Sequence, residues 1–266
     1  MMLALITYQS QNIQCDAILW DKDGTLLDFM QLWGSWAELL LGHMEGYLQD
    51  RGHSFTGSRE KVMGTIYDAS GKLTGYDPRG PMAMASVQET TAVLAWQLYS
   101  AGVPWDEAIL QITDFSRQAM EQMEQTRPVQ PLPNLIPLLN SCREAGLPLA
   151  VVTSDWTSEA LKHLRWSGLE TYFTEIIGSD LVTSGKPAPD MALLACQRLS
   201  VQPGHTILIG DSNADMQMGR QAELACCIGI APTAEAPTHL PDADIIIHDY
   251  RELQIITADG SQSVQE

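Results

Sequence analysis

Short apolar runs that end in polar residues alternate with helix-length segments through the second half of the sequence. This alternation constrains the fold more than any other feature. The runs are four to seven residues long and rich in Val, Ile and Leu, as buried strands are. The six runs interpreted as strands are AILW (17–20), LPLAVVT (147–153), TEIIG (174–178), HTILIG (205–210), CCIGI (226–230) and ADIII (243–247). Helices are expected near 133–145, 156–167, 188–200 and 213–224. The pattern predicts an α/β fold with a doubly wound, Rossmann-like parallel sheet.

Residues 30–129 separate the first predicted strand from the others and have a helical pattern. We expect a first helix with an apolar stripe, then helices over 58–69, 86–101 and 105–125, with a long glycine-rich loop over 69–82. The stripe consists of Trp33, Trp36, Leu40, Met44, Tyr47 and Leu48. The proline-rich stretch 127–134 is interpreted as a return hinge. We therefore expect a core domain of residues 1–29 and 130–266 and an inserted all-helical domain of residues 30–129.

Charge and cysteine content narrow the possible partners. The formal net charge of −18 argues against nucleic acid or an anionic membrane as the main partner. The five cysteines form no CxxC pair and are interpreted as reduced thiols of a cytosolic protein. The N-terminus lacks the basic region of a signal peptide, and no apolar stretch is long enough to span a membrane. We expect a cytoplasmic protein, and its oligomeric state cannot be read from the sequence.

Polar residues that could carry chemistry follow several of the predicted strands. Ligands of an open parallel sheet bind beyond the carboxyl ends of its strands, so these residues are expected to share one rim. They are Asp21 and Asp23 after the first strand, Thr153, Ser154 and Asp155 after the second, Lys186 in the loop after the third, and Asp211 and Asp215 after the fourth.

This set of side chains suits phosphoryl transfer. One carboxylate can attack phosphorus, a second can act as general acid and base, and Mg²⁺ prefers oxygen ligands. A hydroxyl, backbone N–H groups and a lysine can hold the phosphoryl oxygens. Taken singly, each residue also has an ordinary structural interpretation: Asp21 and Asp23 as turn formers, Asp211 and Asp215 as a helix N-cap and first-turn acid.

The segments DKDGTL, VVTS, GKPAPD and GDSNAD, in that order, resemble the four motifs of the haloacid dehalogenase superfamily of phosphohydrolases. The resemblance implies that the insertion is a helical cap domain and that Asp21 is the nucleophile and Asp23 the general acid and base. It implies phosphate binding by Thr153, Ser154 and Lys186. It also implies Mg²⁺ binding by Asp21, Asp211 and the backbone carbonyl of Asp23, with Asp215 positioning the metal or Lys186.

Within this superfamily, Asp23 and Thr25 favour a phosphatase. The dehalogenases lack an acid at the position of Asp23, and the phosphoglucomutases commonly have valine at the position of Thr25. The overall pattern most resembles the phosphoglycolate phosphatase branch, which implies a small phosphomonoester as substrate. Two alternatives remain open: a phosphomutase of the β-phosphoglucomutase type, and a non-catalytic phosphate-binding regulatory module.

Further expectations concern Lys72, Arg79, Lys22 and Glu223. Lys72 and Arg79, in the glycine-rich loop, are predicted substrate contacts. Strand alternation predicts that Lys22 points away from Asp21 and Asp23. Glu223 stands where the family usually has glycine, which leaves the geometry of that turn open. No role is assigned to residues 1–14 or to the chain after about 252.

Overall fold

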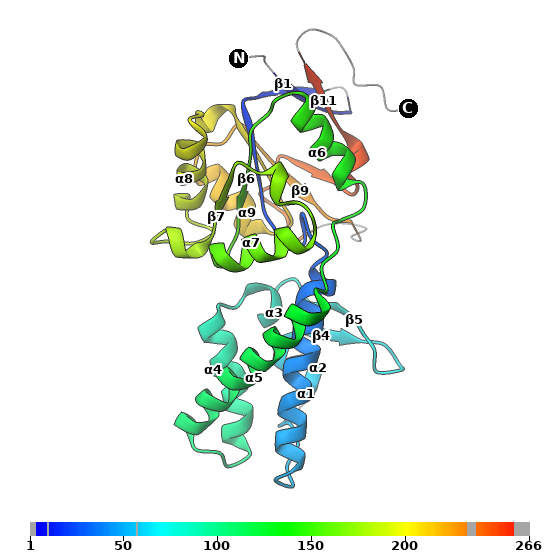
Figure 1. Ribbon diagram of the computed structural model, residues 1–266, viewed down its shortest axis with the longest axis vertical. Helices are drawn as coiled ribbons and strands as arrows, with labels where there is room; N and C mark the ends of the chain where they lie inside the picture. Colours follow the sequence, from blue (N-terminus) through cyan, green and yellow to red (C-terminus); the bar gives the residue numbers. More distant parts are fainter. Residues whose placement is uncertain (1–3, 10, 57, 233–237, 258–266) are drawn as a thin grey trace. The chain divides into compact units, whose positions relative to one another are not determined.

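The computed structural model describes residues 4–9, 11–56, 58–232 and 238–257. The chain divides into two compact units, which are described one at a time (Figure 1). Residues 1–28 and 129–266 form the unit we call the core unit, and residues 29–128 form the inserted unit. No helix in the described part of the chain is long and apolar enough to cross a membrane.

The core unit is built on a six-stranded sheet in the order β10-β9-β8-β3-β6-β7. All neighbouring strands in this sheet are parallel. The strands are β3 (Ala17–Trp20), β6 (Leu149–Val152), β7 (Glu175–Ile177), β8 (Thr206–Gly210), β9 (Cys226–Ile230) and β10 (Ile245–Ile247). The six strands predicted from the apolar runs, and the α/β fold class, are confirmed.

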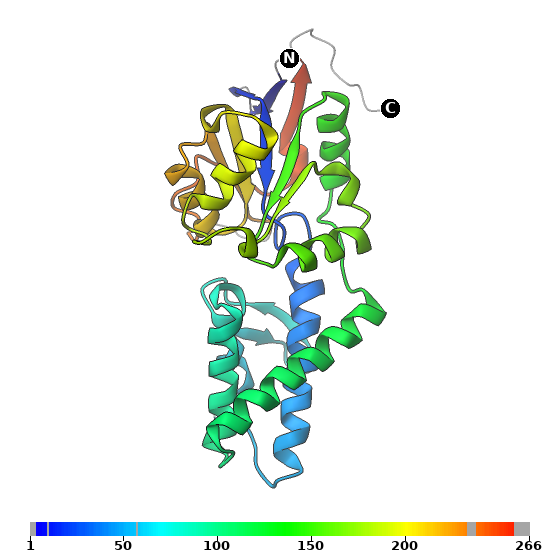
Figure 2. The same cartoon turned by 60° about the vertical axis from the view of Figure 1, so that its left-hand side comes forward.

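Helices cover both faces of this sheet because both faces are apolar (Figure 2). Along β3, Ile18 and Trp20 enter one core cluster and Leu19 enters the other, as the two-residue period of a strand requires. Helices α8 (Asp190–Leu199) and α9 (Asn213–Gln221) supply the cluster around Leu19. Helices α6 (Leu135–Glu144) and α7 (Thr157–Trp166) contribute to the cluster around Ile18 and Trp20.

Short 3-10 helices lie in the connections of the core unit. They are η2 (Glu170–Tyr172), η3 (Ser179–Leu181), η4 (Pro203–His205) and η5 (Tyr250–Glu252). Two of them lead directly into strands, because η4 ends one residue before β8 begins and η5 ends one residue before β11 (Leu253–Thr257) begins.

A second, antiparallel sheet completes the core unit and was not predicted. Its order is β11-β1-β2, with β1 (Ala4–Tyr8) in the centre, β2 (Gln11–Cys15) on one side and β11 on the other. Ile6 of β1 and Ile255 of β11 pair across the strands and are buried in the same cluster as Trp20. Most of the N-terminal segment and the first part of the tail thus pack against the core; residues 258–266 lie outside the described chain.

The inserted unit is mainly helical. Its core is formed by three long helices together with α2, and the cluster includes Leu41, Leu94 and Ile112. The elements are the π-helix η1 (Met30–Gly34), α1 (Ser35–Gln49), α2 (Arg59–Met63), β4 (Thr65–Tyr67), β5 (Leu73–Tyr76), α3 (Pro81–Met84), α4 (Val87–Ser100) and α5 (Trp105–Thr126).

The helix predicted over 58–69 and the loop predicted over 69–82 are partly wrong. Helix α2 ends at Met63 because Gly64 adopts a left-handed conformation, with φ of 73°, and its N–H donates to Glu60 O at 2.8 Å. The following residues, Thr65–Tyr67, are β-branched or aromatic and form β4, which pairs with β5 as a hairpin. The inserted unit is therefore not all-helical.

Candidate active site

Apart from Lys186, which lies in the connection between β7 and α8, the predicted site residues of the core unit lie beyond the carboxyl ends of three adjacent strands, β8, β3 and β6. Asp21 follows β3 directly, and its backbone N–H donates to Ile209 O of β8 at 2.9 Å. Asp211 follows β8, and Thr153 follows β6. The sheet order therefore brings together residues that are far apart in the sequence.

Three carboxylates and one lysine form a largely buried group at this rim. One oxygen from each of Asp21, Asp211 and Asp215 lies within 4.8 Å of the others. Lys186 Nζ lies 2.5 Å from Asp21 Oδ1 and 2.6 Å from Asp215 Oδ1. Lys186 thus joins two of the three carboxylates, and the GKPAPD loop is held to both the β3 and β8 ends of the sheet.

Burial and mutual repulsion make this group unfavourable in its fully ionised form. Burial raises the pKa of Asp21 to about 6, with further increases from Asp215 and Asp23, against the opposing effect of Lys186. Burial, with the charges of Asp21 and Asp215, also raises the pKa of Asp211 well above its usual value. Burial opposes the charge on Lys186, but the carboxylates of Asp21 and Asp215 outweigh it and raise the Lys186 pKa. One ammonium therefore compensates the three acids incompletely.

The donor set fits a hard divalent cation. Mg²⁺ binds carboxylate oxygens, and a cation beside Asp21 and Asp211 would relieve the repulsion that raises their pKa values. The predicted ligands were the carboxylates of Asp21 and Asp211 and the backbone carbonyl of Asp23. The carboxylates that lie together in the structure are those of Asp21, Asp211 and Asp215, and Asp215 was predicted to position the metal or Lys186.

Gly24 allows Asp211 to approach the loop that follows β3. Its φ is +80°, and a Cβ at this position would clash with Asp211 Oδ2. Thr25, which is fully buried, donates from Oγ1 to Asp211 Oδ1 at 3.4 Å. The DGT sequence thus lets the Asp211 carboxylate come close to Gly24 and donates a hydroxyl hydrogen bond to it from Thr25; this role of Thr25 was not predicted.

Asp215 combines the structural and functional interpretations that the sequence left open. Its Oδ2 accepts hydrogen bonds from the Ser212 N–H at 3.1 Å and from Ser212 Oγ at 2.5 Å, in a capping box at the start of α9. Its Oδ1 pairs with Lys186. A helix cap therefore fixes the orientation of the carboxylate that holds the lysine.

The expectation for Lys22 is wrong. Its side chain is fully buried, and Nζ lies 2.6 Å from Asp23 Oδ1 and 3.4 Å from Asp155 Oδ2. Strand alternation does not apply at Lys22 because β3 ends at Trp20 and the chain then turns, with the N–H groups of Leu26 and Leu27 both donating to Lys22 O.

The remaining predicted residues occupy different surroundings. Thr153 is buried, and its Oγ1 accepts a hydrogen bond from the Asp155 N–H at 3.2 Å, whereas Ser154 is exposed. Lys72 and Arg79 belong to the inserted unit. The Lys72 N–H donates to Asp68 Oδ1 at 3.1 Å, and the Arg79 side chain is 85% exposed.

Tyr250, in the 3-10 helix η5 before β11, was also missed. It is buried, and its hydroxyl donates to Thr25 O at 2.7 Å. Its ring lies 5.7 Å from that of Trp20, the last residue of β3. No sequence signal marked it, because Tyr250 lies beyond the last of the four motifs.

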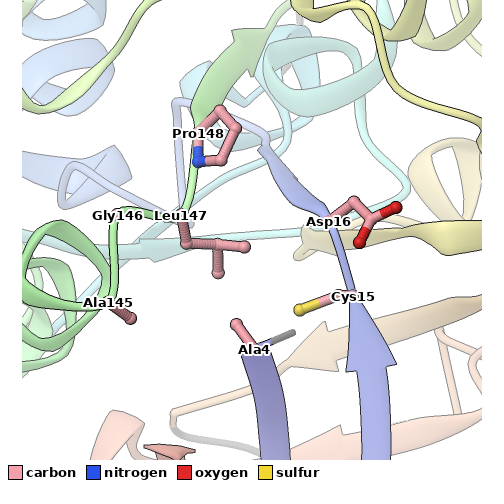
Figure 3. Close-up of a pocket in the computed structure, with 7 residues that line it drawn as sticks. All are labelled: Ala4, Cys15, Asp16, Ala145, Gly146, Leu147 and Pro148. Carbon is pink, nitrogen blue, oxygen red and sulfur yellow. The ribbon is translucent and has the colours of Figure 1, made fainter. Parts of the chain in front are cut away.

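A cavity of about 210 Å³ lies at the opposite edge of the sheet (Figure 3). Its lining includes Cys15 and Asp16, which precede β3, and Leu147 and Pro148, which precede β6. Asp16 is the one charged residue among the lining residues. This cavity is therefore at the amino ends of the strands and does not include the acid group around Asp21.

The sequence profile of the haloacid dehalogenase-like hydrolases matches residues 15–223. The protein therefore belongs to this family of hydrolases, and the prediction made from the four motifs is confirmed.

Several curated proteins with phosphatase names are similar to this chain. Hexitol phosphatase A of Escherichia coli strain K12 is 27% identical over 251 residues, which span 91% of this chain and 95% of that protein. A probable phosphatase of Dickeya dadantii strain 3937, IndB, is 33% identical over 135 residues, which span 49% of this chain and 58% of that protein. Phosphoglycolate phosphatase of Escherichia coli strain K12 is 33% identical over 90 residues, spanning 34% of this chain and 36% of that enzyme. The predicted likeness to the phosphoglycolate phosphatase branch is confirmed as homology.

Solved structures show the same fold. The crystal structure of a predicted phosphoglycolate phosphatase from Haemophilus somnus 129pt has a TM-score of 0.63 at 20% sequence identity. The match covers 89% of this chain and 95% of that chain. At this identity the likeness establishes the fold alone.

Proposed function

We propose that this protein is a Mg²⁺-dependent phosphatase that hydrolyses a small phosphomonoester through an aspartyl phosphate on Asp21. The observation that carries the proposal is the contact of Lys186 with both Asp21 and Asp215, beside Asp211, at the carboxyl edge of the sheet. This arrangement supports the proposal because the proposed nucleophile, a cation that could hold phosphoryl oxygens and carboxylates that could bind a metal belong to one group. Family membership and the phosphatase relatives support the same chemistry.

In the first step, a carboxylate oxygen of Asp21 attacks phosphorus and the bond to the leaving oxygen breaks, while Asp23 donates a proton to that oxygen. In the second step, Asp23 accepts a proton from water, the water oxygen attacks phosphorus, and the bond to Asp21 breaks to release phosphate. Lys186, Thr153 and Ser154 hold the phosphoryl oxygens through both steps. Asp21 attacks in its ionised form, and a pKa of about 6 leaves it ionised at neutral pH.

Mg²⁺, when bound, neutralises charge on the phosphoryl group and on the carboxylates. Asp21 and Asp211 would hold it, with the backbone carbonyl of Asp23 as a further ligand. Asp215 would contribute through its contact with Lys186 and its position in the carboxylate group.

The proposed substrates are small phosphorylated sugar alcohols or hydroxy acids, as the names of the relatives suggest. The inserted unit would serve as the cap domain that selects among them, with Lys72 and Arg79 as substrate contacts. The five buried free thiols support a reducing, cytoplasmic location.

The test is the release of phosphate from a panel of phosphorylated metabolites and 4-nitrophenyl phosphate, with Mg²⁺ or EDTA. We expect Mg²⁺-dependent turnover by the wild type and a loss of at least about 10³-fold in kcat for Asp21→Asn. Asp16→Asn is the matched control, because Asp16 stands before β3, at the other edge of the sheet. Full activity of Asp21→Asn would refute the nucleophile assignment, and isomerised sugar phosphate in place of free phosphate would favour a phosphomutase.

A further inference from the structure

Lys22 is a fully buried cation that has no role in the reaction steps proposed above. Its side-chain exposure is 0%, and it stands between the proposed nucleophile, Asp21, and the proposed acid and base, Asp23. Burying an ammonium is unfavourable unless nearby charges and hydrogen bonds compensate it. The surroundings of Lys22 are therefore expected to be specific.

Three groups from two parts of the core unit surround its ammonium. Nζ lies 2.6 Å from Asp23 Oδ1, 3.4 Å from Asp155 Oδ2 and 3.2 Å from His163 Nδ1. Asp155 and His163 also approach each other, with 3.5 Å between His163 Nδ1 and Asp155 Oδ2. The ammonium therefore has a partner on its own loop and further partners beyond β6.

The partners beyond β6 are themselves held in place. His163 is fully buried on α7. Asp155 Oδ1 accepts a hydrogen bond from the Trp156 N–H at 2.9 Å, and the Asp155 N–H donates to Thr153 Oγ1 at 3.2 Å. His163 on α7 and Asp155 after β6 thus hold the lysine ammonium in place.

The accessible end of this group is the Asp23 carboxylate. Its side chain is 16% exposed, whereas Lys22 is completely buried. The ion pair occupies Oδ1 of Asp23, which leaves Oδ2 as the oxygen for proton exchange. A carboxylate that transfers protons must be held within hydrogen-bond reach of the reacting oxygen, and a misplacement of about 1 Å can cost about 10²-fold in rate.

We propose that Lys22 is a positioning residue that holds the Asp23 carboxylate in the orientation for proton transfer, and that Asp155 and His163 anchor its ammonium. This inference rests on the proposed function, because it takes Asp23 as the general acid and base. It adds Lys22, Asp155 and His163 to the residues on which the reaction depends.

The test exploits the fact that a poor leaving group needs an acid more than a good one does. The variant is Lys22→Met, and the measured quantity is kcat/KM for 4-nitrophenyl phosphate and for the best alkyl phosphate of the panel. General acid catalysis contributes about 10²- to 10⁴-fold, so we expect Lys22→Met to slow the alkyl phosphate at least about tenfold more than the aryl phosphate. The inhibition constant for inorganic phosphate should stay within about threefold, because Lys22 does not belong to the proposed phosphate-binding residues.

Two further variants complete the design. Asp23→Asn is the reference and should show the largest difference between the two leaving groups. Lys162→Met is the matched control: Lys162 lies on α7 and pairs with Glu159 at 3.0 Å, and both rates should stay within about twofold of wild type. Thermal unfolding of each variant establishes that it is folded.

Should Lys22→Met fail to fold, Lys22→Arg retains the buried charge, but its planar guanidinium cannot reproduce the contacts of a compact ammonium. It should show the same preference for the aryl substrate. Equal losses for both leaving groups, or none, in the folded variant would overturn the inference. That result differs from failure of the proposed function, in which the wild type releases no phosphate or Asp23→Asn retains full activity.

Discussion

The raised pKa of Asp21 predicts how the stability of the metal-free protein depends on pH. The carboxyl has a pKa of about 6 in the folded protein, against an ordinary value of 3.8, and burial is the main cause. The folded state therefore binds more protons than the unfolded state between these two values. Since stability rises with pH only where the unfolded state binds more protons, the Asp21 contribution must fall as pH rises through this window.

The difference between the two pKa values sets the magnitude. At about 1.4 kcal/mol per pKa unit, a change from 3.8 to about 6 corresponds to about 3 kcal/mol over the whole window. Between about pH 7 and about pH 4.5, roughly 2 kcal/mol of this should be gained. Asp21→Asn removes the titrating group, so the variant should lack this gain.

The assay is urea unfolding of wild type and Asp21→Asn, in EDTA, at both pH values. For each protein we take the change in unfolding free energy between the two pH values, and we then compare these two changes. Carboxylates with lowered pKa values, such as Asp155 and Asp249, lose stabilising interactions as pH falls. They do so equally in both proteins, so their effect cancels in the comparison. A difference below about 0.5 kcal/mol, or one of the opposite sign, would falsify the account of the buried acid group.

Three substitutions test other features of the site and its surroundings. Gly24→Ala places a methyl group against Asp211 at a φ of +80°, and we expect about 1–3 kcal/mol of destabilisation in chemical unfolding and a higher Mg²⁺ concentration for half-maximal turnover. Wild-type stability would contradict the close approach of Asp211 to Gly24. Tyr250→Phe removes the hydroxyl that donates to Thr25 O at 2.7 Å, and we expect a loss of about 1–3 kcal/mol, whereas an unchanged midpoint would show that this bond contributes nothing net. Glu223→Gly should stabilise the protein by about 0.5–1 kcal/mol, because Glu223 has a φ of 55°; Glu223→Ala, which keeps the Cβ, is the control and should give no such gain.

The sequence alone was sufficient for the parallel sheet and for the place of the site on it. Buried strands are continuous apolar runs, so β3, β6 and β8 could be located without any knowledge of their neighbours. The topology of an α/β sheet then places Asp21, Thr153 and Asp211 at one edge, since each follows a strand of the same direction. The family resemblance marked Glu223 as a departure from the usual glycine, and the structure shows that this residue takes the left-handed conformation expected of glycine.

Only the tertiary structure shows which of these residues contact one another and which other segments and side chains hold them in place. The β1-β2-β11 sheet joins the two ends of the chain, and such pairing between distant segments leaves no local periodicity to read. The contact of Lys22 with Asp23, Asp155 and His163 depends on a turn directly after Trp20, and that turn reverses the direction that strand alternation would give. The sequence by itself therefore determined the fold class and the inventory of reactive groups, because these follow from local hydrophobic patterns and residue types. Only the folded chain decided their pairing, because burial and charge compensation arise between segments far apart in the sequence.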